Sequence, residues 1–260
     1  MEPRLKEYDW MAVRRFVMAQ DKWLADTKPT SIEQLLKVEL NGKIISEALC
    51  SPGDRLDLAF GMLAQRGLLQ SLAEVVSCEL AGGVSRVQTT PLAQARARHR
   101  EDDPRYYNLS RLRIWRGLEA AGDDVRVAAV KVLRTANTLL GELAVTHERT
   151  KGVHSGVLYD PVADEILAFR EDIGRHNVFD KLHGWAIRQD VDLADKLLVF
   201  SGRCSTEMIL KLWRMGCRLV LAKSVPTTLS LELAEKLGIT LMARLTRDGF
   251  SVYTHPERVY

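Results

Sequence analysis

Cysteine is scarce in this chain, with four residues among 260. Cys50, Cys78, Cys204 and Cys217 lie far apart, so the CxxC pairs of zinc ribbons and redox dithiols are absent. In a reducing compartment, dispersed cysteines are most often small buried apolar residues. The cysteine pattern therefore indicates neither a structural metal centre nor a redox dithiol.

Long apolar runs and a strong charge are also absent. No stretch approaches the roughly 18 apolar residues of a membrane span, and residues 1–7 lack the apolar core of a signal peptide. The net charge of +3 gives no reason to expect a nucleic acid or a membrane as partner. We therefore expect a cytoplasmic protein, with a core large enough for one large or two modest domains.

Common catalytic motifs are missing as well. The chain has no P-loop and no GxGxxG, and Ser155 does not lie in the GxSxG elbow of serine hydrolases. His147-Glu148 is not followed by the second histidine of a zincin. Nucleotide binding through a standard glycine-rich fingerprint and these two kinds of hydrolysis are therefore excluded.

The first half of the chain is predicted to hold an appendage and a smaller α+β portion. Residues 1–30 form a helical appendage, with an amphipathic helix from Trp10 to Trp23. Residues 31–123 hold a β-hairpin around Asn41-Gly42, a helix over 56–64, and strands over 74–80 and 84–88. Arginines crowd residues 94–116, which we interpret as an exposed basic connection.

Residues 124–260 alternate between helix and strand patterns. A helix is expected over 124–143, with Val130 and Leu133 on its apolar face. Strands over 153–159, 165–169, 196–200, 218–222 and 240–244 alternate with helices over 175–188, 206–215 and 229–237, and 250–254 can add an edge strand. Such alternation indicates βαβ units, so the predicted fold class is α/β with a mostly parallel sheet flanked by helices.

Two strand-to-helix connections predict an anion site. Residues 201–205 and 223–228 each follow a predicted strand and precede a helix. Ligands bind at the carboxyl ends of strands in open sheets, where helix N-termini favour anions. The residues predicted to hold phosphates are Ser201, Gly202, Arg203 and Lys223. The alternative is that Ser205 and Thr227 merely cap their helices.

The densest polar run, residues 170–177, follows another predicted strand. His176 in this run and His154 in the predicted strand 153–159 are candidates for proton transfer, since histidine titrates near neutrality. Glu171 and Asp172 can instead stabilise the next helix N-terminus, with Asp180 and Lys181 on that helix's solvated face.

Several of these runs together resemble the formate dehydrogenase accessory protein (FdhD/NarQ) family. They are Lys151–Ser155, Arg170–Asn177 with Asp180-Lys181, Ser201–Arg203 with Ser205 and Glu207, and Gly238–Leu241. Val38–Gly42, Ser51–Asp54 and Leu58–Gly61 fit the same family near the start. The resemblance covers about residues 32–90 and 145–256.

The resemblance implies a cytidine-deaminase-like core over residues 124–260 and a role in sulfur transfer. A family member accepts sulfur from a cysteine desulfurase and passes it to molybdenum bis(molybdopterin guanine dinucleotide), the cofactor of formate dehydrogenase. We expect a homodimer from the resemblance. By its order in the chain, the segment matched to the family's cofactor binding is Arg244, Leu245, Thr246, Arg247, Asp248, Gly249. The candidate cofactor-binding residues from the loops and polar runs above are His154, Arg175, Ser201, Gly202, Arg203 and Lys223.

One departure from the family concerns the persulfide cysteine. The family carries it in a CGxCG-like loop, whereas residues 86–124 here contain no cysteine. Cys78 is nearest in sequence but lies in a strand pattern and is expected to be buried. Cys204 precedes a predicted helix, whose N-terminus should lower the thiol pKa and make it a substitute.

Three functions therefore stay open. The chain can be a sulfur carrier that uses Cys204 or Cys78, with His176 moving protons. It can be a non-catalytic chaperone that binds the cofactor without a persulfide. A deaminase-like hydrolase is a remote alternative, because the HxE and PCxxC motifs of zinc deaminases are absent.

Overall fold

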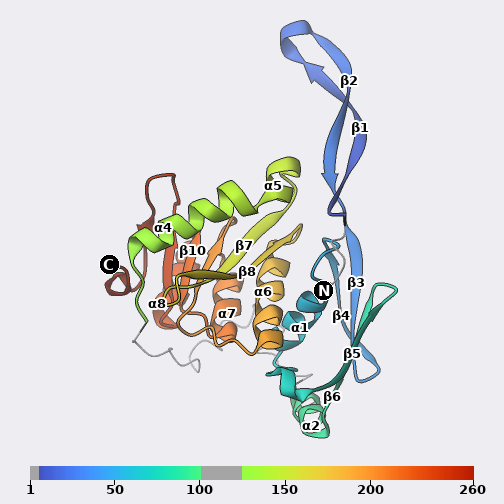
Figure 1. Cartoon of the computed structure of the whole chain (residues 1–260), viewed down its shortest axis with the longest axis vertical. Helices are drawn as coiled ribbons and strands as arrows, with labels where there is room; N and C mark the ends of the chain where they lie inside the picture. The colour runs from blue at the N-terminus through green and yellow to red at the C-terminus, as the bar shows by residue number, and fades with distance from the viewer. Residues whose placement is uncertain (1–5, 101–124) are drawn as a thin grey trace.

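The computed structural model describes residues 6–100 and 125–260. The described residues form a two-stranded, a four-stranded and a six-stranded sheet (Figure 1). Most of the predicted basic connection, residues 101–116, lies outside the described residues. Its first part, residues 94–100, is not a loop but belongs to the helix α2 (Pro91–Arg100).

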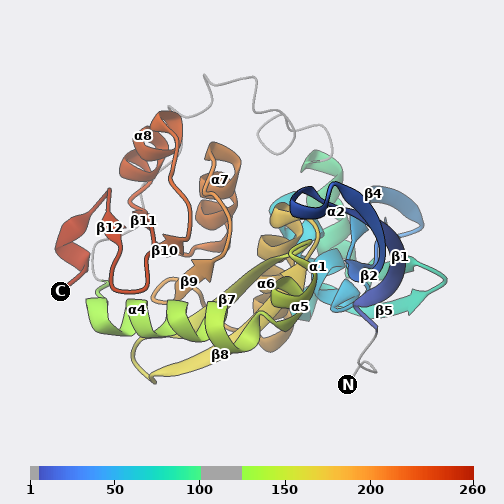
Figure 2. The same cartoon turned by 90° about the horizontal axis from the view of Figure 1, so that it is seen from above.

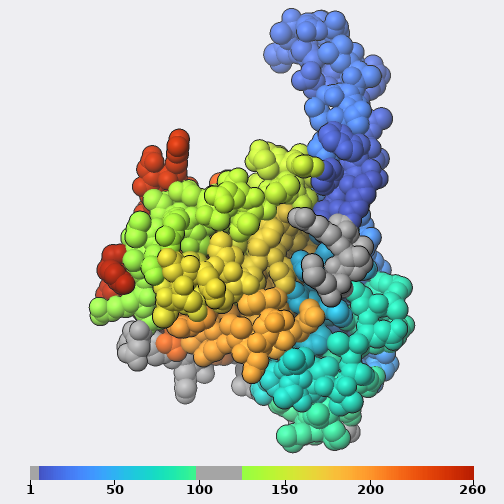
Figure 3. Space-filling model, viewed as in Figure 1, coloured from blue at the N-terminus to red at the C-terminus, as the bar shows by residue number. Residues whose placement is uncertain are grey.

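The N-terminal appendage is a β-hairpin and not a helix. Strands β1 (Tyr8–Val17) and β2 (Lys22–Ser31) pair antiparallel and are joined by the 3-10 turn η1 (Met18–Gln20). The hairpin projects from the body of the molecule (Figures 1 and 3). Its bulky side chains face solvent, for example Trp10 at 60% and Trp23 at 58% exposure. The predicted amphipathic helix over 10–23 is therefore wrong.

The smaller portion is built on a four-stranded sheet. Strands β3 (Gln34–Leu40), β4 (Lys43–Cys50), β5 (Val75–Ala81) and β6 (Val84–Thr89) lie in the order β4-β3-β6-β5. Asn41 and Gly42 both have positive φ, which confirms the predicted hairpin turn. Helix α1 (Arg55–Gln65) packs on one face of the sheet, and the 3-10 turn η2 (Leu72–Glu74) leads into β5.

The larger sheet has six strands in the order β12-β11-β10-β9-β7-β8. They are β7 (His154–Asp160), β8 (Glu165–Asp172), β9 (Leu197–Phe200), β10 (Leu219–Ala222), β11 (Thr240–Ala243) and β12 (Ser251–Val252). Only the β9–β10 and β10–β11 pairs of this sheet are parallel. The β7–β8, β7–β9 and β11–β12 pairs are antiparallel, so the sheet is mixed and not mostly parallel.

Helices cover both faces of the larger sheet (Figure 2). One core cluster joins the sheet to α6 (Arg175–Gln189), α7 (Thr206–Met215) and α8 (Thr228–Lys236). The other cluster joins it to α4 (Ala129–Thr138) and the π-helical segment η4 (Leu139–Leu143), which is followed by α5 (Val145–Thr150). Val132 and Ala136 of α4 are buried while Val130 is exposed, so the apolar face of this helix was predicted wrongly. The 3-10 turn η5 (Pro256–Arg258) comes near the end of the chain.

The two portions are joined where α1 packs against α6. A Cβ atom on Gly61 would lie 1.8 Å from the carbonyl oxygen of Asp180, and one on Gly184 would lie 1.8 Å from that of Asp57. Glycine is therefore required at both positions, because the two helix backbones approach too closely for any side chain.

Candidate functional site

The carboxyl ends of β9, β10 and β11 meet at one edge of the larger sheet, as the sequence predicted. The backbone links the loops that leave these strands. Lys223 N donates to Phe200 O at 2.9 Å, and Leu245 N donates to Lys223 O at 3.1 Å. Ser224 N also donates to Gly202 O at 3.4 Å. We call this region the strand-end edge, formed by residues 154–155, 171–176, 201–205, 223–227 and 244–249.

The start of β7 reaches the same edge because β7 runs antiparallel to β9. Ser155 N donates to Ser201 Oγ at 2.8 Å, and Ser201 N donates back to Ser155 O at 2.9 Å. His154 lies beside Phe200, with 5.8 Å between ring centroids. A Cβ on Gly202 would lie 2.6 Å from the Phe200 ring, so glycine lets the loop pass close over these rings.

Cationic and titratable groups gather at this edge. Burial lowers the pKa of His154, and the positive charge of Arg175 lowers it further. Burial also lowers the pKa of His176, although Glu207 lies 3.2 Å away. Both imidazoles are therefore held toward their neutral forms.

Two polar atoms near this edge have no hydrogen-bond partner among the described residues. They are Ser205 Oγ and Arg175 Nε, and both atoms are buried. Ser205 precedes α7 without capping it, whereas Thr227 caps α8 through a reciprocal bond with Ser230. Capping thus accounts for Thr227 but not for Ser205. Unpaired donors of this kind suit a ligand rich in acceptor oxygens.

Basic side chains line the exposed rim of the edge. Arg203, Lys223 and Arg244 are all exposed, and Arg244 adopts a left-handed backbone with φ 56°. In the segment 244–249, Thr246 N donates to Gly249 O at 2.8 Å, which closes a turn. Asn137 of α4 donates to Arg247 O at 3.3 Å. The structure therefore places the predicted cofactor residues on one continuous edge.

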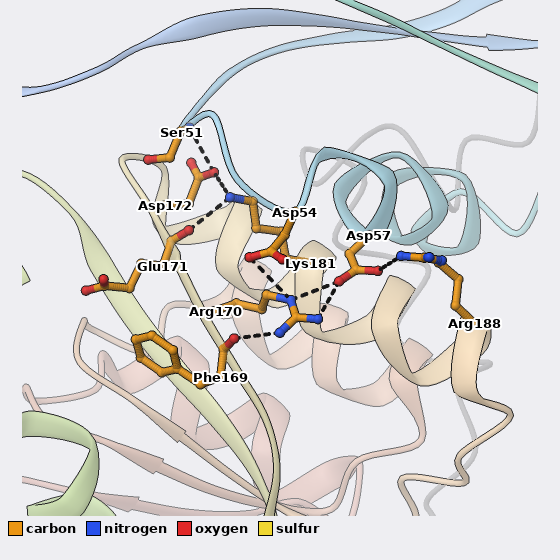
Figure 4. A network of polar contacts seen from close by, with 9 residues as sticks. All are labelled: Ser51, Asp54, Asp57, Phe169, Arg170, Glu171, Asp172, Lys181 and Arg188. Carbon is orange, nitrogen blue, oxygen red and sulfur yellow. Dashed lines mark hydrogen bonds and ion pairs between the residues drawn. The ribbon is translucent and has the colours of Figure 1, made fainter. Parts of the chain in front are cut away.

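The polar run 170–177 has mainly structural contacts (Figure 4). Arg170 Nη2 lies 2.5 Å from Asp57 Oδ2, and Lys181 Nζ lies 2.8 Å from Asp172 Oδ2. Asp172 Oδ2 also accepts from Ser51 N at 3.1 Å. These contacts bind α1 and the chain before it to the larger portion.

The expectation that Asp180 and Lys181 face solvent is wrong. Lys181 is 0% and Asp180 is 5% exposed. Lys181 sits between Asp172 and the carbonyl of Glu171, and Asp180 pairs with Lys211. Lys181 therefore joins α6 to β8, and Asp180 joins α6 to α7.

Three of the cysteines are buried. Burial raises the pKa of Cys50 to about 11 and that of Cys204 and Cys217 to about 12. The predicted lowering of the Cys204 pKa is therefore wrong, because burial dominates over the nearby helix N-terminus. Cys78 was expected to be buried but is exposed on β5, an outer strand of the four-stranded sheet.

Sequence reasoning missed the contacts that Ser155 and Glu171 make at this edge. Glu171 accepts from Ser155 Oγ at 2.9 Å, and from Thr146 N and His147 N at 3.1 and 3.0 Å. The signal was the pairing of Ser155 with Glu171 across two adjacent strands, which requires the register of β7 and β8.

The described residues lack two further kinds of feature. No helix in that part of the chain is long and apolar enough to cross a membrane. Within residues 6–100 and 125–260, no His, Cys, Asp and Glu side chains form a group of three that could hold a metal ion.

Comparison with known proteins identifies the class of protein that carries this fold and edge. A model of the FdhD/NarQ family matches residues 31–260. The "Sulfur carrier protein FdhD" of Geobacillus kaustophilus (strain HTA426) is 32% identical over 268 residues, covering 94% of this chain and 92% of that protein. The protein of the same name from Shouchella clausii (strain KSM-K16) is 34% identical over 242 residues, covering 89% and 90%.

A solved structure has the same fold. It is the crystal structure of a candidate formate dehydrogenase accessory protein from Desulfotalea psychrophila, with a TM-score of 0.79 and 19% identity. The match covers 98% of this chain and 100% of that one. The chain therefore belongs to the FdhD/NarQ family, as its motifs predicted.

Proposed function

We propose that this protein is a formate dehydrogenase maturation factor. It binds molybdenum bis(molybdopterin guanine dinucleotide) as a client and supports its sulfuration. Family membership and the names of the relatives support the role. The convergence of basic and unpaired donor groups at the strand-end edge carries the binding proposal. Formate dehydrogenase and a cysteine desulfurase are the partners that this role implies.

The phosphates of the nucleotide would be held by the loops after β9 and β10. Gly202 gives the backbone close access, while Arg203 and Lys223 supply positive charge at the rim. Ser205 Oγ and Arg175 Nε supply buried donors that the protein itself leaves unpaired. His154 would be neutral in the free protein and can gain a proton when a phosphate approaches.

Calorimetric titration with guanosine diphosphate tests this site, since the nucleotide stands in for one end of the cofactor. We expect binding, and Arg203→Ala should weaken it by at least about tenfold, because a charged hydrogen bond contributes about 1.5–3 kcal/mol. Arg86→Ala is the matched control, because Arg86 is exposed on the smaller sheet. Equal affinity of Arg203→Ala and wild type would remove Arg203 from the site.

Sulfur carriage, where this chain performs it, is assigned to Cys78. This thiol is exposed, whereas burial keeps the other thiols protonated at neutral pH. The Cys78 thiolate would attack the outer sulfur of the desulfurase persulfide. The sulfur–sulfur bond there breaks, the desulfurase thiolate leaves, and a persulfide forms on Cys78.

Incubation with a cysteine desulfurase and sulfur-labelled cysteine tests the assignment. We expect reducible label on the wild-type chain, no label on Cys78→Ser, and full label on the control Cys217→Ser. A wild-type chain without any bound sulfane sulfur would instead be a cofactor-binding chaperone. That result would leave the nucleotide titration unaffected, so the two parts of the proposal are tested separately.

A further inference from the structure

Glu171 lies behind the rim of the strand-end edge. It is one end of a row of hydrogen bonds that crosses this edge. On β8 it faces Ser155 of β7 in register, and Ser155 Oγ donates to its carboxylate at 2.9 Å. Ser155 in turn exchanges two hydrogen bonds with Ser201, at 2.8 and 2.9 Å. The row therefore runs from Glu171 through Ser155 to the first residue of the loop after β9.

The same carboxylate also fixes a helix. It accepts from the backbone N–H groups of Thr146 and His147 at the start of α5. A carboxylate at this place satisfies donors that the helix leaves unpaired. With Ser155 as a third donor, the carboxylate of Glu171 is solvated by groups of the protein itself.

Glu171 is itself held in place from the opposite side. Its carbonyl accepts from Lys181 Nζ at 2.9 Å, while its side chain points away from Lys181 (Figure 4). Lys181 is completely buried and paired with Asp172. The backbone of Glu171 is thus anchored to a buried ion pair, from the side opposite to its carboxylate.

We propose that Glu171 is the positioning residue of the strand-end edge. It sets the place of Ser201 and Gly202 through Ser155, and that of His147 through α5, without contacting the ligand. The identity of the ligand rests on the proposed function, whereas the effect of Glu171 on the loop does not.

The first test measures the loop without ligand. Amide hydrogen exchange at Ser155 and Ser201, whose N–H groups donate within the row, should be faster in Glu171→Ala than in wild type, because the row has lost its anchor. Glu171→Gln retains one acceptor oxygen and should recover part of the protection. Glu165→Gln, at the exposed start of the same strand, is the control. Unchanged exchange at these amides in Glu171→Ala would overturn the proposal, whether or not nucleotide binds.

The second test is a double-mutant cycle on guanosine diphosphate affinity. Glu171→Gln and Ser201→Ala should each weaken binding about tenfold, and the double variant should weaken it by much less than the product, since both interrupt one row. If the loss of affinity in the double variant equals the product of the two single losses, Glu171 and Ser201 act independently, and the row is refuted. If wild type binds no nucleotide, the proposed function fails while the exchange result still stands.

Discussion

Substitution of Gly184 by alanine tests how the two portions are joined. The new Cβ would lie 1.8 Å from the carbonyl oxygen of Asp57 and 2.7 Å from the amide nitrogen of Gly61. Real Cβ contacts essentially never fall below 3.0 Å, and here the atoms that must move belong to a helix backbone. Overpacking of this kind costs about 1–3 kcal/mol, and a rigid neighbour places Gly184→Ala near 3 kcal/mol.

A gain partly offsets this cost, because alanine favours a helix over glycine by about 1 kcal/mol. We therefore expect a net loss of about 2 kcal/mol in the free energy of unfolding, or about 4–8 °C in Tm for a protein of this size. Urea denaturation followed by circular dichroism measures the first quantity and calorimetry the second.

Gly141→Ala is the matched control, since nothing lies within 4 Å of a Cβ at that helical position. It should leave the stability unchanged or raise it by up to about 1 kcal/mol. If Gly184→Ala were as stable as Gly141→Ala, α1 and α6 would not be in the close contact described above.

Two further predictions concern buried groups. Burial, with a smaller effect of Lys211, lowers the pKa of His183 to about 3. The unfolded chain then binds the extra proton below pH 6.5, so stability is lost as the pH falls, by about 2 kcal/mol between pH 7.5 and 5. In His183→Gln, the free energy of unfolding from urea titrations should differ less between the two pH values. A difference as large as that of the wild type would contradict the role of His183. Lys181→Met should lower the free energy of unfolding by about 3–5 kcal/mol, because it leaves Asp172 buried without its cation. Adding Asp172→Asn should recover part of that loss in the same assay, and strictly additive losses would argue against the pair.

The alternating half of the chain was predicted well because its signals are local. Helices α6, α7 and α8 and their neighbouring strands agree with the expected ranges within a few residues. Left-handed Gly216 ends α7 as the sequence indicated. The direction of β7 and β8 was missed, although the link of four residues from Pro161 to Asp164 is short enough to indicate a hairpin.

The hairpin of β1 and β2 was missed for a different physical reason. Its turn has no Asn-Gly pair, and the left-handed residue there is Asp21, with φ 47°. Its register places Phe16 opposite Trp23, with ring centroids 5.4 Å apart. These aromatics support each other across the strands, whereas the same spacing along the sequence also fits one face of a helix.

At the candidate site, the gathering of the loops was predictable and the cysteines were not. Parallel strands bring Arg203 and Lys223 to one edge whatever the side chains do. The pKa of Cys204 depends on how completely the loop is covered, and the exposure of Cys78 depends on the position of β5 at the outside of its sheet. Both are tertiary properties that no local pattern contains.

The charged residues 170–172 lie next to one another in the sequence because they serve two different sets of contacts. Successive side chains of a strand point to opposite faces. Arg170 and Asp172 therefore face α1 and α6, where they bind Asp57 and Lys181. Glu171, between them, faces the other way and holds α5 and β7. One short strand thus carries the contacts that join the two portions and, through the intervening residue, those that position the strand-end edge. A disturbance of the α1–α6 junction should for this reason reach the loop at Ser201.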